Sequence, residues 1–150
     1  RGDGCFDAAI NVFTSFGYFE DPADDRRVLD NLHASLRPGG KLLIDTIGKE
    51  VVARIFTSSD WRRFGDLLCL TERTIDCEWT WIRNHQILIW GDKRREFDMD
   101  HRLYSAAELK ALLADCGFAD ITCYGGMDAT PYDQNARRLV VVATRPGQTV

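Results

Sequence analysis

The chain has 150 residues, of which 45% are hydrophobic and 28% are charged, and its formal net charge is -4. That balance is ordinary for one globular domain, and its acidic sign disfavours a nucleic-acid partner, because phosphate backbones repel it. No apolar run approaches the roughly 18 residues of a membrane helix, and no apolar stretch follows the first basic residue as in a signal peptide. We therefore expect a cytoplasmic protein with neither a nucleic-acid nor a membrane partner.

Five cysteines stand at positions 5, 69, 77, 116 and 123. Their number is odd, no C-x-x-C motif occurs, and none stands beside a histidine at the spacing of zinc ligands. Reduced thiols in the cytoplasm are typical of this pattern, and we expect no metal site.

The first third of the chain predicts a strand, a helix and a second strand. Residues 6–13, FDAAINVF, are mostly apolar, which is typical of a strand buried on both faces of a parallel sheet. Asp21 and Pro22 predict a helix start, and an apolar stripe at helical spacing follows: Val28, Leu29, Leu32 and Leu36. The RPGG at 37–40 would end this helix, and residues 42–46, LLIDT, would form a short buried strand. Such a crossover indicates a parallel α/β sheet.

The middle of the chain has a different pattern. Residues 51–64 predict a helix that contains Trp61. From 68 to 104 the chain is rich in β-branched and aromatic residues, and WGDK at 90–93 is typical of a hairpin turn, because glycine and aspartate tolerate positive φ. We expect a small antiparallel insert of two or three strands over about residues 68–104.

The last third returns to a helix and strands. Residues 105–116 predict a helix, in which Ser105 and Glu108 make a capping box. Residues 121–124 and 139–143 predict two strands with a loop between them. No repeat, low-complexity tract or linker divides residues 1–150, so we expect one domain.

Three segments in this order resemble the C-terminal half of a class I S-adenosylmethionine-dependent methyltransferase: FDAAINVFTSFGYF, VLDNLHASLRPGGKLLIDT and YSAAELKALLADCGF. The nearest branch is similar to small-molecule methyltransferases that include sugar-amine N-methyltransferases. The resemblance covers nearly the whole chain, and INVFTSFGYF and LRPGGKLLIDT are its most specific parts. It implies an α/β, Rossmann-like, seven-stranded sheet. This chain would supply about the last four strands and the antiparallel insert.

The resemblance also implies that a part of the domain is missing. The family's first strand ends in a glycine-rich loop around the cofactor's methionine portion, and its second strand ends in an acidic residue that holds the ribose. Neither is present, because RGDGC at the start has no strand before it and no helix after it. About 80 to 100 residues would be absent, judged by typical domain sizes. We expect the complete domain to be an enzyme and this chain alone to be inactive.

The resemblance places S-adenosylmethionine at the end of the first strand. Ligands of open α/β sheets bind outside the carboxyl ends of the strands, at the point where the strand order reverses. The implied cofactor contacts are Asn11, Phe13, Thr14, Ser15 and Phe16. The rings of Phe13 and Phe16 could shield the sulfonium. They could equally be core residues at a strand–helix junction.

The methyl acceptor would be an amine or hydroxyl of a small molecule. Its implied contacts are Tyr18, Phe19, Arg102, Tyr104 and Tyr132. Tyr18 and His101 are the candidate catalytic residues, since a hydroxyl can orient the nucleophile and an imidazole titrates near neutral pH. A lone histidine in a strand is more often structural, and Arg102 could bind an acidic substrate group or simply pair with Asp100.

The insert and the first strand allow further interpretations of the chain's function. Trp79, Trp81 and Trp90 could line a pocket, pack on the core or form a dimer contact. The alternative function is a stand-alone, non-catalytic α/β module that binds a ligand or partner. Such a module would oligomerise through its first strand, because an uncovered strand edge pairs readily. A homo-oligomer through the first strand or the insert is therefore possible in either case.

Overall fold

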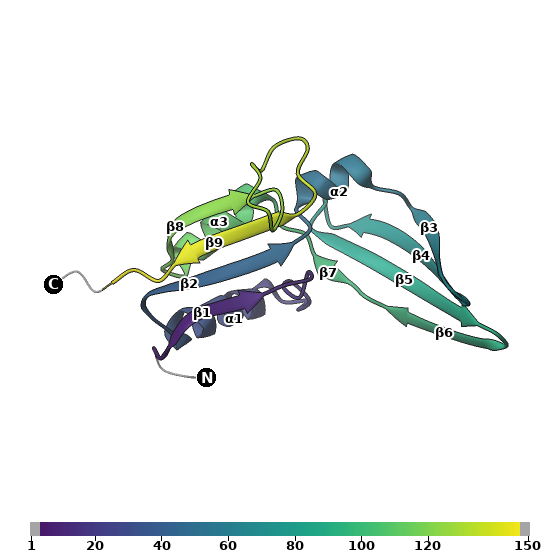
Figure 1. Ribbon diagram of the computed structural model, residues 1–150, viewed down its shortest axis with the longest axis horizontal. Coiled ribbons are helices and arrows are strands. Elements are labelled where there is room, and N and C mark those ends of the chain that lie inside the picture. Colours follow the sequence, from purple (N-terminus) through teal and green to yellow (C-terminus); the bar gives the residue numbers. More distant parts are fainter. Residues whose placement is uncertain (1–3, 148–150) are drawn as a thin grey trace.

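The computed structural model describes residues 4–147 and contains two β-sheets (Figure 1). The first sheet has four strands in the order β1-β2-β9-β8, and with two helices it forms the α/β body. Its elements are β1 (Phe6–Asn11), α1 (Pro22–Ser35), β2 (Leu36–Thr46), α3 (Ala106–Asp115), β8 (Ala119–Tyr124) and β9 (Leu139–Thr144). β1 runs parallel to β2, whereas β9 runs antiparallel to both of its neighbours.

The second sheet, which we call the wing, is antiparallel and projects from the body (Figure 1). It contains β3 (Ser59–Phe64), β4 (Leu67–Asp76), β5 (Trp81–Trp90), β6 (Lys93–Asp98) and β7 (His101–Arg102). The short helix α2 (Lys49–Ile55) lies where the two sheets meet (Figure 1). The predicted insert is thus present, but it has five strands and begins near residue 59.

Local signals account for both helices of the body. The Asp21 side chain accepts a hydrogen bond from the Ala23 amide, and Pro22 follows at the first helical position, as predicted. Ser105 and Glu108 form the predicted reciprocal capping box at the start of α3. α1 and α3 pack on one face of the sheet and share one core with it, which includes Leu29, Leu113 and Val141.

Two predictions about the strands of the body were wrong. β2 begins at Leu36, so the RPGG segment belongs to the strand, where Gly39 and Gly40 exchange backbone hydrogen bonds with Arg145 of the chain's last strand region. β1 is the edge strand within residues 4–147, and only one of its faces is covered: Ala9 packs against the core, whereas the side chains of the opposite face are exposed. Phe6 is 52% exposed and Ile10 is 72% exposed.

The predicted helix over residues 51–64 was also wrong in its second half. α2 ends at Ile55, and Trp61 lies in β3, opposite Leu70 of β4. Pairing with a neighbouring strand overrode the helical pattern, which is a tertiary effect. The hairpin between β5 and β6 is confirmed, with Gly91 at φ 58°.

A small second core joins the wing to α2. It contains Val52, Ile82 and Leu103, with Ile47 and Ile75 packed against it. All five cysteines are free. No helix among the described residues is long and apolar enough to cross a membrane.

Candidate functional site

The carboxyl ends of β1 and β2 lie side by side at one end of the body sheet. An ion pair between Asp45 and Arg138 holds the chain there. Asp45 is 5% exposed and accepts hydrogen bonds from Arg138 Nε at 2.7 Å and Nη2 at 3.0 Å. The same carboxylate accepts the Phe13 amide at 3.0 Å, and Arg138 Nη2 also donates to Thr14 Oγ1 at 3.0 Å. The pair therefore holds the turn that follows β1.

This turn has an unusual backbone. Phe13 and Thr14 both have φ 57°, in the left-handed region that bulky and β-branched residues rarely adopt. The Thr14 amide donates to the Asp45 carbonyl at 3.0 Å, and the Ser15 hydroxyl donates to the Val12 carbonyl at 2.6 Å. Backbone strain of this kind persists where the surroundings impose it, and it is frequent at ligand sites.

The predicted cofactor contacts divide into three groups. Asn11 Oδ1 is buried and has no hydrogen-bond partner within residues 4–147, so it is an acceptor without a donor. The Phe13 ring is 86% exposed at the sheet edge, whereas the hydroxyls of Thr14 and Ser15 are engaged within the turn. Phe16 is 2% exposed in the core, 5.5 Å from the Tyr104 ring, which favours the alternative that it is a core residue at the strand–helix junction.

A second polar cluster ties the body to the wing. Asp25 of α1 is fully buried and accepts the Tyr104 hydroxyl at 2.7 Å. Arg102 Nε lies 3.3 Å from the same oxygen, without the alignment of a hydrogen bond, while its Nη2 donates to the Glu20 carbonyl at 2.7 Å. The Arg102 guanidinium also lies 5.4 Å from the centre of the Trp81 ring.

This cluster changes the interpretation of two predicted substrate residues. Arg102 pairs with Asp25, and Asp100 instead pairs with Arg83 at 3.1 Å. Burial raises the pKa of Asp25, against the opposing hydrogen bond from Tyr104 and the charge of Arg102, and burial likewise raises the pKa of Tyr104. The Tyr104 hydroxyl and Arg102 Nη2 are therefore engaged by the protein itself, and the Arg102 charge faces Asp25.

The segment after the turn lies against β7, which brings the two candidate catalytic residues together. The Arg102 amide donates to the Gly17 carbonyl at 2.7 Å. Gly17 has φ 98°, and a Cβ there would lie 3.0 Å from the Arg102 oxygen, so the close approach favours glycine. The ring centres of Tyr18 and His101 are consequently 5.7 Å apart.

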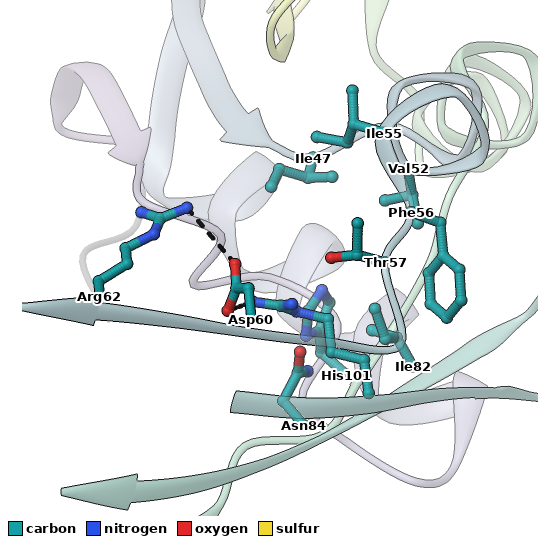
Figure 2. A pocket seen from close by; sticks show the side chains of 11 residues that line it. Ile47, Val52, Ile55, Phe56, Thr57, Asp60, Arg62, Ile82, Asn84 and His101 are labelled. Atoms are coloured by element: carbon teal, nitrogen blue, oxygen red, sulfur yellow. Dashed lines mark hydrogen bonds and ion pairs between the residues drawn. The ribbon is translucent and has the colours of Figure 1, made fainter. Parts of the chain in front are cut away.

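His101 lines a pocket of about 230 Å³ between α2 and the wing (Figure 2). One wall is apolar and includes Ile47, which is the first residue after β2. The other wall is polar: Thr57, Asp60, Arg62, Arg73, Asn84 and His101. Asp60 lies 3.2 Å from Arg73 and 3.9 Å from Arg62, so its charge is balanced, and Figure 2 shows it joined to Arg62.

The protonation state of His101 follows from its burial. Desolvation lowers the pKa of His101 below its usual range, and the nearby Asp100 charge opposes this only in part. Its ring receives no hydrogen bond from the part of the chain that the structure describes. The imidazole is therefore neutral at about pH 7 and able to accept a proton.

The remaining predicted residues lie outside this pocket. The Tyr132 hydroxyl donates to Glu50 Oε2 at 2.9 Å, on the side of α2 that meets α3, and Phe19 is 49% exposed. Trp81 packs under Arg102 and borders a separate hollow, and Trp79 contacts Phe56. None of the three tryptophans considered lines the pocket that contains His101.

Sequence reasoning missed the two ion pairs that shape the site. Asp45 and Arg138 are 93 residues apart, and no local pattern joins them. Asp25 stands in the first turn of α1, where an acidic residue is ordinary on a surface helix. Within residues 4–147, no group of three or more His, Cys, Asp or Glu side chains is placed to hold a metal ion.

Comparison with known proteins identifies the fold. No family model and no curated protein matches the sequence. Among solved structures, the chain is similar to the CcbJ methyltransferase from Streptomyces caelestis, with a TM-score of 0.79 and 16% identity over 91% of this chain and 59% of that one. This chain has the fold of S-adenosylmethionine-dependent methyltransferases. The predicted Rossmann-like α/β fold is thereby confirmed.

Two further structures agree. An S-adenosylmethionine-dependent methyltransferase from Clostridium acetobutylicum has a TM-score of 0.78 and 13% identity, over 95% of this chain and 59% of that one. CalS10, an amino pentose methyltransferase from Micromonospora echinaspora with S-adenosylmethionine bound, has a TM-score of 0.65 and 20% identity, over 93% of this chain and 58% of that one. The chain thus spans less than two thirds of the length of these structures.

Proposed function

We propose that this chain is the C-terminal part of an S-adenosylmethionine-dependent methyltransferase that acts on an amine or hydroxyl of a small molecule. The observation that carries the proposal is the position of the His101 pocket. It opens one residue beyond the carboxyl end of β2, beside Tyr18, at the edge where ligands of α/β sheets bind. A small polar pocket with a neutral imidazole fits a metabolite better than a macromolecule.

The turn after β1 fits one end of the cofactor. S-adenosylmethionine carries an ammonium group and supplies a methyl group on a positively charged sulfonium. Asn11 Oδ1 is a buried acceptor that such an ammonium would satisfy. The exposed face of Phe13 would lie toward a cation at the same edge.

The rest of the cofactor would need residues outside this chain. We propose that a further segment of the domain pairs along the free edge of β1 and contributes the glycine-rich loop and the ribose-binding acid. The side chains of Phe6 and Ile10 point to one face of the sheet, so a layer of that segment packed on this face would cover them. The isolated chain should then bind the cofactor weakly or not at all.

His101 would act as the general base for the methyl acceptor. An amine held in the pocket forms its new bond to the methyl carbon as the bond from carbon to sulfur breaks, and the amine proton moves to the neutral imidazole. Tyr18, exposed beside His101, would orient the acceptor through its hydroxyl. Asp60 and its two arginines offer both charge signs to a polar substrate such as an amino sugar, the substrate class that the CalS10 description names.

The compartment is part of the proposal. Five free thiols, two of them exposed, are typical of a reducing environment, so we place the reaction in the cytoplasm. The acidic balance of the sequence likewise supports a small-molecule substrate over a nucleic acid.

A methyl-transfer assay on the gene's full product tests the function. The protein is incubated with S-adenosylmethionine and a panel of amino sugars, simple amines and phenols, and methylated products are detected by mass. His101→Asn should lower kcat by about 100-fold or more, while the affinity for the cofactor is unchanged. A full product that does not bind S-adenosylmethionine would instead support the alternative, a non-catalytic module that assembles through its first strand.

A further inference from the structure

A short segment between the turn after β1 and the start of α1 carries two exposed aromatic rings. We call residues 16–20 the strap; they form neither helix nor strand. Phe16 fixes one end of the strap in the core, whereas Tyr18 is 43% exposed and Phe19 is 49% exposed. Among the described residues, the backbone of the strap makes hydrogen bonds to Arg102 alone. The positions of the two exposed rings therefore depend on this arginine.

Arg102 holds the strap at two points. Its amide donates to the Gly17 carbonyl at 2.7 Å, and its Nη2 donates to the Glu20 carbonyl at 2.7 Å. These two carbonyls lie on either side of Tyr18 and Phe19 in the sequence. A segment that is bonded on both sides of its exposed side chains loses much of its backbone freedom, so their rings are held in place.

The strap crosses the edge of β7 and thereby reaches both faces of the wing. β7 pairs with β5 alone among the described strands, and its other edge meets the strap. Successive side chains of a strand point to opposite faces. His101 accordingly lines the pocket, while Arg102 lies over the Trp81 ring. The Tyr18 ring lies 5.7 Å from the His101 ring, and the Glu20 carbonyl meets Arg102.

The arginine is itself fixed by the buried cluster. Arg102 Nε lies 3.3 Å from Asp25 Oδ2, and the guanidinium lies 5.4 Å from the centre of the Trp81 ring. Its side chain is only 15% exposed, and the Asp25 side chain is fully buried. A planar guanidinium can meet a carboxylate, a ring face and a carbonyl at the same time, which a single ammonium group cannot do. The contacts therefore require an arginine and not merely a positive charge.

We propose that Arg102 is a positioning residue for methyl transfer, which sets the place of the Tyr18 ring relative to His101 by holding the strap on both sides of that ring. The inference rests on the proposed function, in which Tyr18 orients the methyl acceptor and His101 takes its proton. Arg102 acts through Tyr18, because its guanidinium lies on the face of the wing opposite the pocket. An orienting group that is displaced by about 1 Å can lower a rate by about 100-fold.

Arg102→Lys separates positioning from stability. The lysine keeps a positive charge beside Asp25, but its single nitrogen cannot also reach the Glu20 carbonyl. In the gene's full product, kcat for the acceptor found in the methyl-transfer assay should fall about 100-fold. The Kd for S-adenosylhomocysteine should stay within about twofold of wild type. Nuclear Overhauser effects between the ring protons of Tyr18 and His101 should be present in wild type and absent in the variant.

Arg83→Lys is the matched control for this substitution. Arg83 lies in β5, donates to Asp76 and Asp100, and makes no hydrogen bond with the strap in the described part of the chain. The same change of side chain should therefore leave both kcat and the Overhauser effects as in wild type.

Gly17→Ala displaces the strap by a different route. Gly17 has φ 98°, and a Cβ there would lie 3.0 Å from the Arg102 carbonyl oxygen, so alanine pushes the strap away from β7 and leaves the Arg102 side chain intact. It should cause the same two losses as Arg102→Lys. Gly65→Ala is its control, because Gly65 has φ 58° and no atom lies within 4 Å of a Cβ there. This variant has backbone strain without displacement of the strap, and both readouts should stay as in wild type.

The two readouts distinguish the inference from the proposed function. A full product that transfers no methyl group would overturn the proposed function, and with it the catalytic role of Arg102, whereas the Overhauser effects need no substrate and still report the strap. With an active wild type, ring contacts that persist in both variants would overturn the inference. So would contacts that are lost without a fall in kcat. If Arg102→Lys does not unfold cooperatively, Gly17→Ala decides alone.

Discussion

The body and the wing differ in how completely they bury their apolar side chains. In the body, α1 and α3 cover one sheet face, and Leu29, Leu109 and Leu113 are fully buried. In the outer half of the wing no apolar side chain is fully buried, although the strands are long and well paired. Hydrogen bonds within a single sheet contribute little net stability without a covered face. The body therefore has a closed core on one sheet face, whereas the wing is anchored mainly at its root.

The two regions also divide the proposed reaction. In that proposal the carboxyl end of β1 would offer the unpaired Asn11 oxygen and the exposed Phe13 ring to the cofactor, and the wing would contribute one wall of the methyl-acceptor pocket. Between them lies the buried cluster of Asp25, Arg102 and Tyr104, which holds the wing in place. Substitutions in the cluster should therefore affect both the body and the wing, whereas substitutions elsewhere should affect only the region in which they lie.

Removing the buried carboxylate should have the largest effect. Asp25→Ala leaves the Arg102 charge and the Tyr104 hydroxyl without their acceptor, and loss of one partner of a buried pair costs about 3–5 kcal/mol. Denaturant unfolding measures this loss. Asp30→Ala, which removes a carboxylate that is 53% exposed on the same helix, should change the free energy of unfolding by less than about 1 kcal/mol. Equal effects of the two variants would mean that the cluster does not join the regions.

Matched leucines compare the two regions directly. Leu113→Ala opens a cavity in the closed core of the body and should cost about 2–5 kcal/mol. Leu88→Ala in the half-buried part of β5 should cost about 1 kcal/mol, because solvent already reaches the side chain and no closed cavity forms. Unfolding curves of both variants, recorded at the same protein concentration, make the comparison. A larger loss for Leu88 would contradict the description of the wing as open.

The fold was predictable where the signal is local. The caps of α1 and α3 and the Gly91 hairpin need only neighbouring residues, and all three were read correctly. β3 was taken for a helix, because its strand state depends on pairing with β4. The exposure of β1 follows from the absence of a covering layer on one face within residues 4–147, and the Asp45–Arg138 pair joins segments 93 residues apart. Topology, which no local pattern contains, decided each of these features.

Two histidines should give the smaller effects, with opposite signs. Burial lowers the pKa of His101, so its contribution to stability is fully present above its ordinary pKa of 6.5 and is lost as the pH falls through the folded-state value. Hydrogen bonding to Asp98, followed by weaker effects of Glu96, raises the pKa of His85. Its contribution is present below 6.5 and is lost as the pH rises through its higher folded-state value.

Substitution separates the two titrations. The difference in melting temperature between wild type and His101→Asn should shrink as the pH falls from about 7.5 to about 5, whereas the difference for His85→Asn should grow over the same range. Comparing each variant with wild type at each pH cancels the other groups. Curves that run in parallel for both variants would show that burial does not distinguish these histidines.

Calorimetric titration of the gene's full product with S-adenosylhomocysteine tests the division of roles most directly. Asn11→Ala removes the unpaired hydrogen-bond acceptor at the carboxyl end of β1. Loss of a hydrogen bond to a charged group should raise Kd by about 10-fold to 100-fold. His101→Asn changes only the pocket proposed for the methyl acceptor, so it should leave the Kd for S-adenosylhomocysteine within about twofold of wild type. Binding that is unaffected by Asn11→Ala, or that is lost with His101→Asn, would contradict the assignment of the cofactor to the edge of the body and of the acceptor to the pocket beneath the wing.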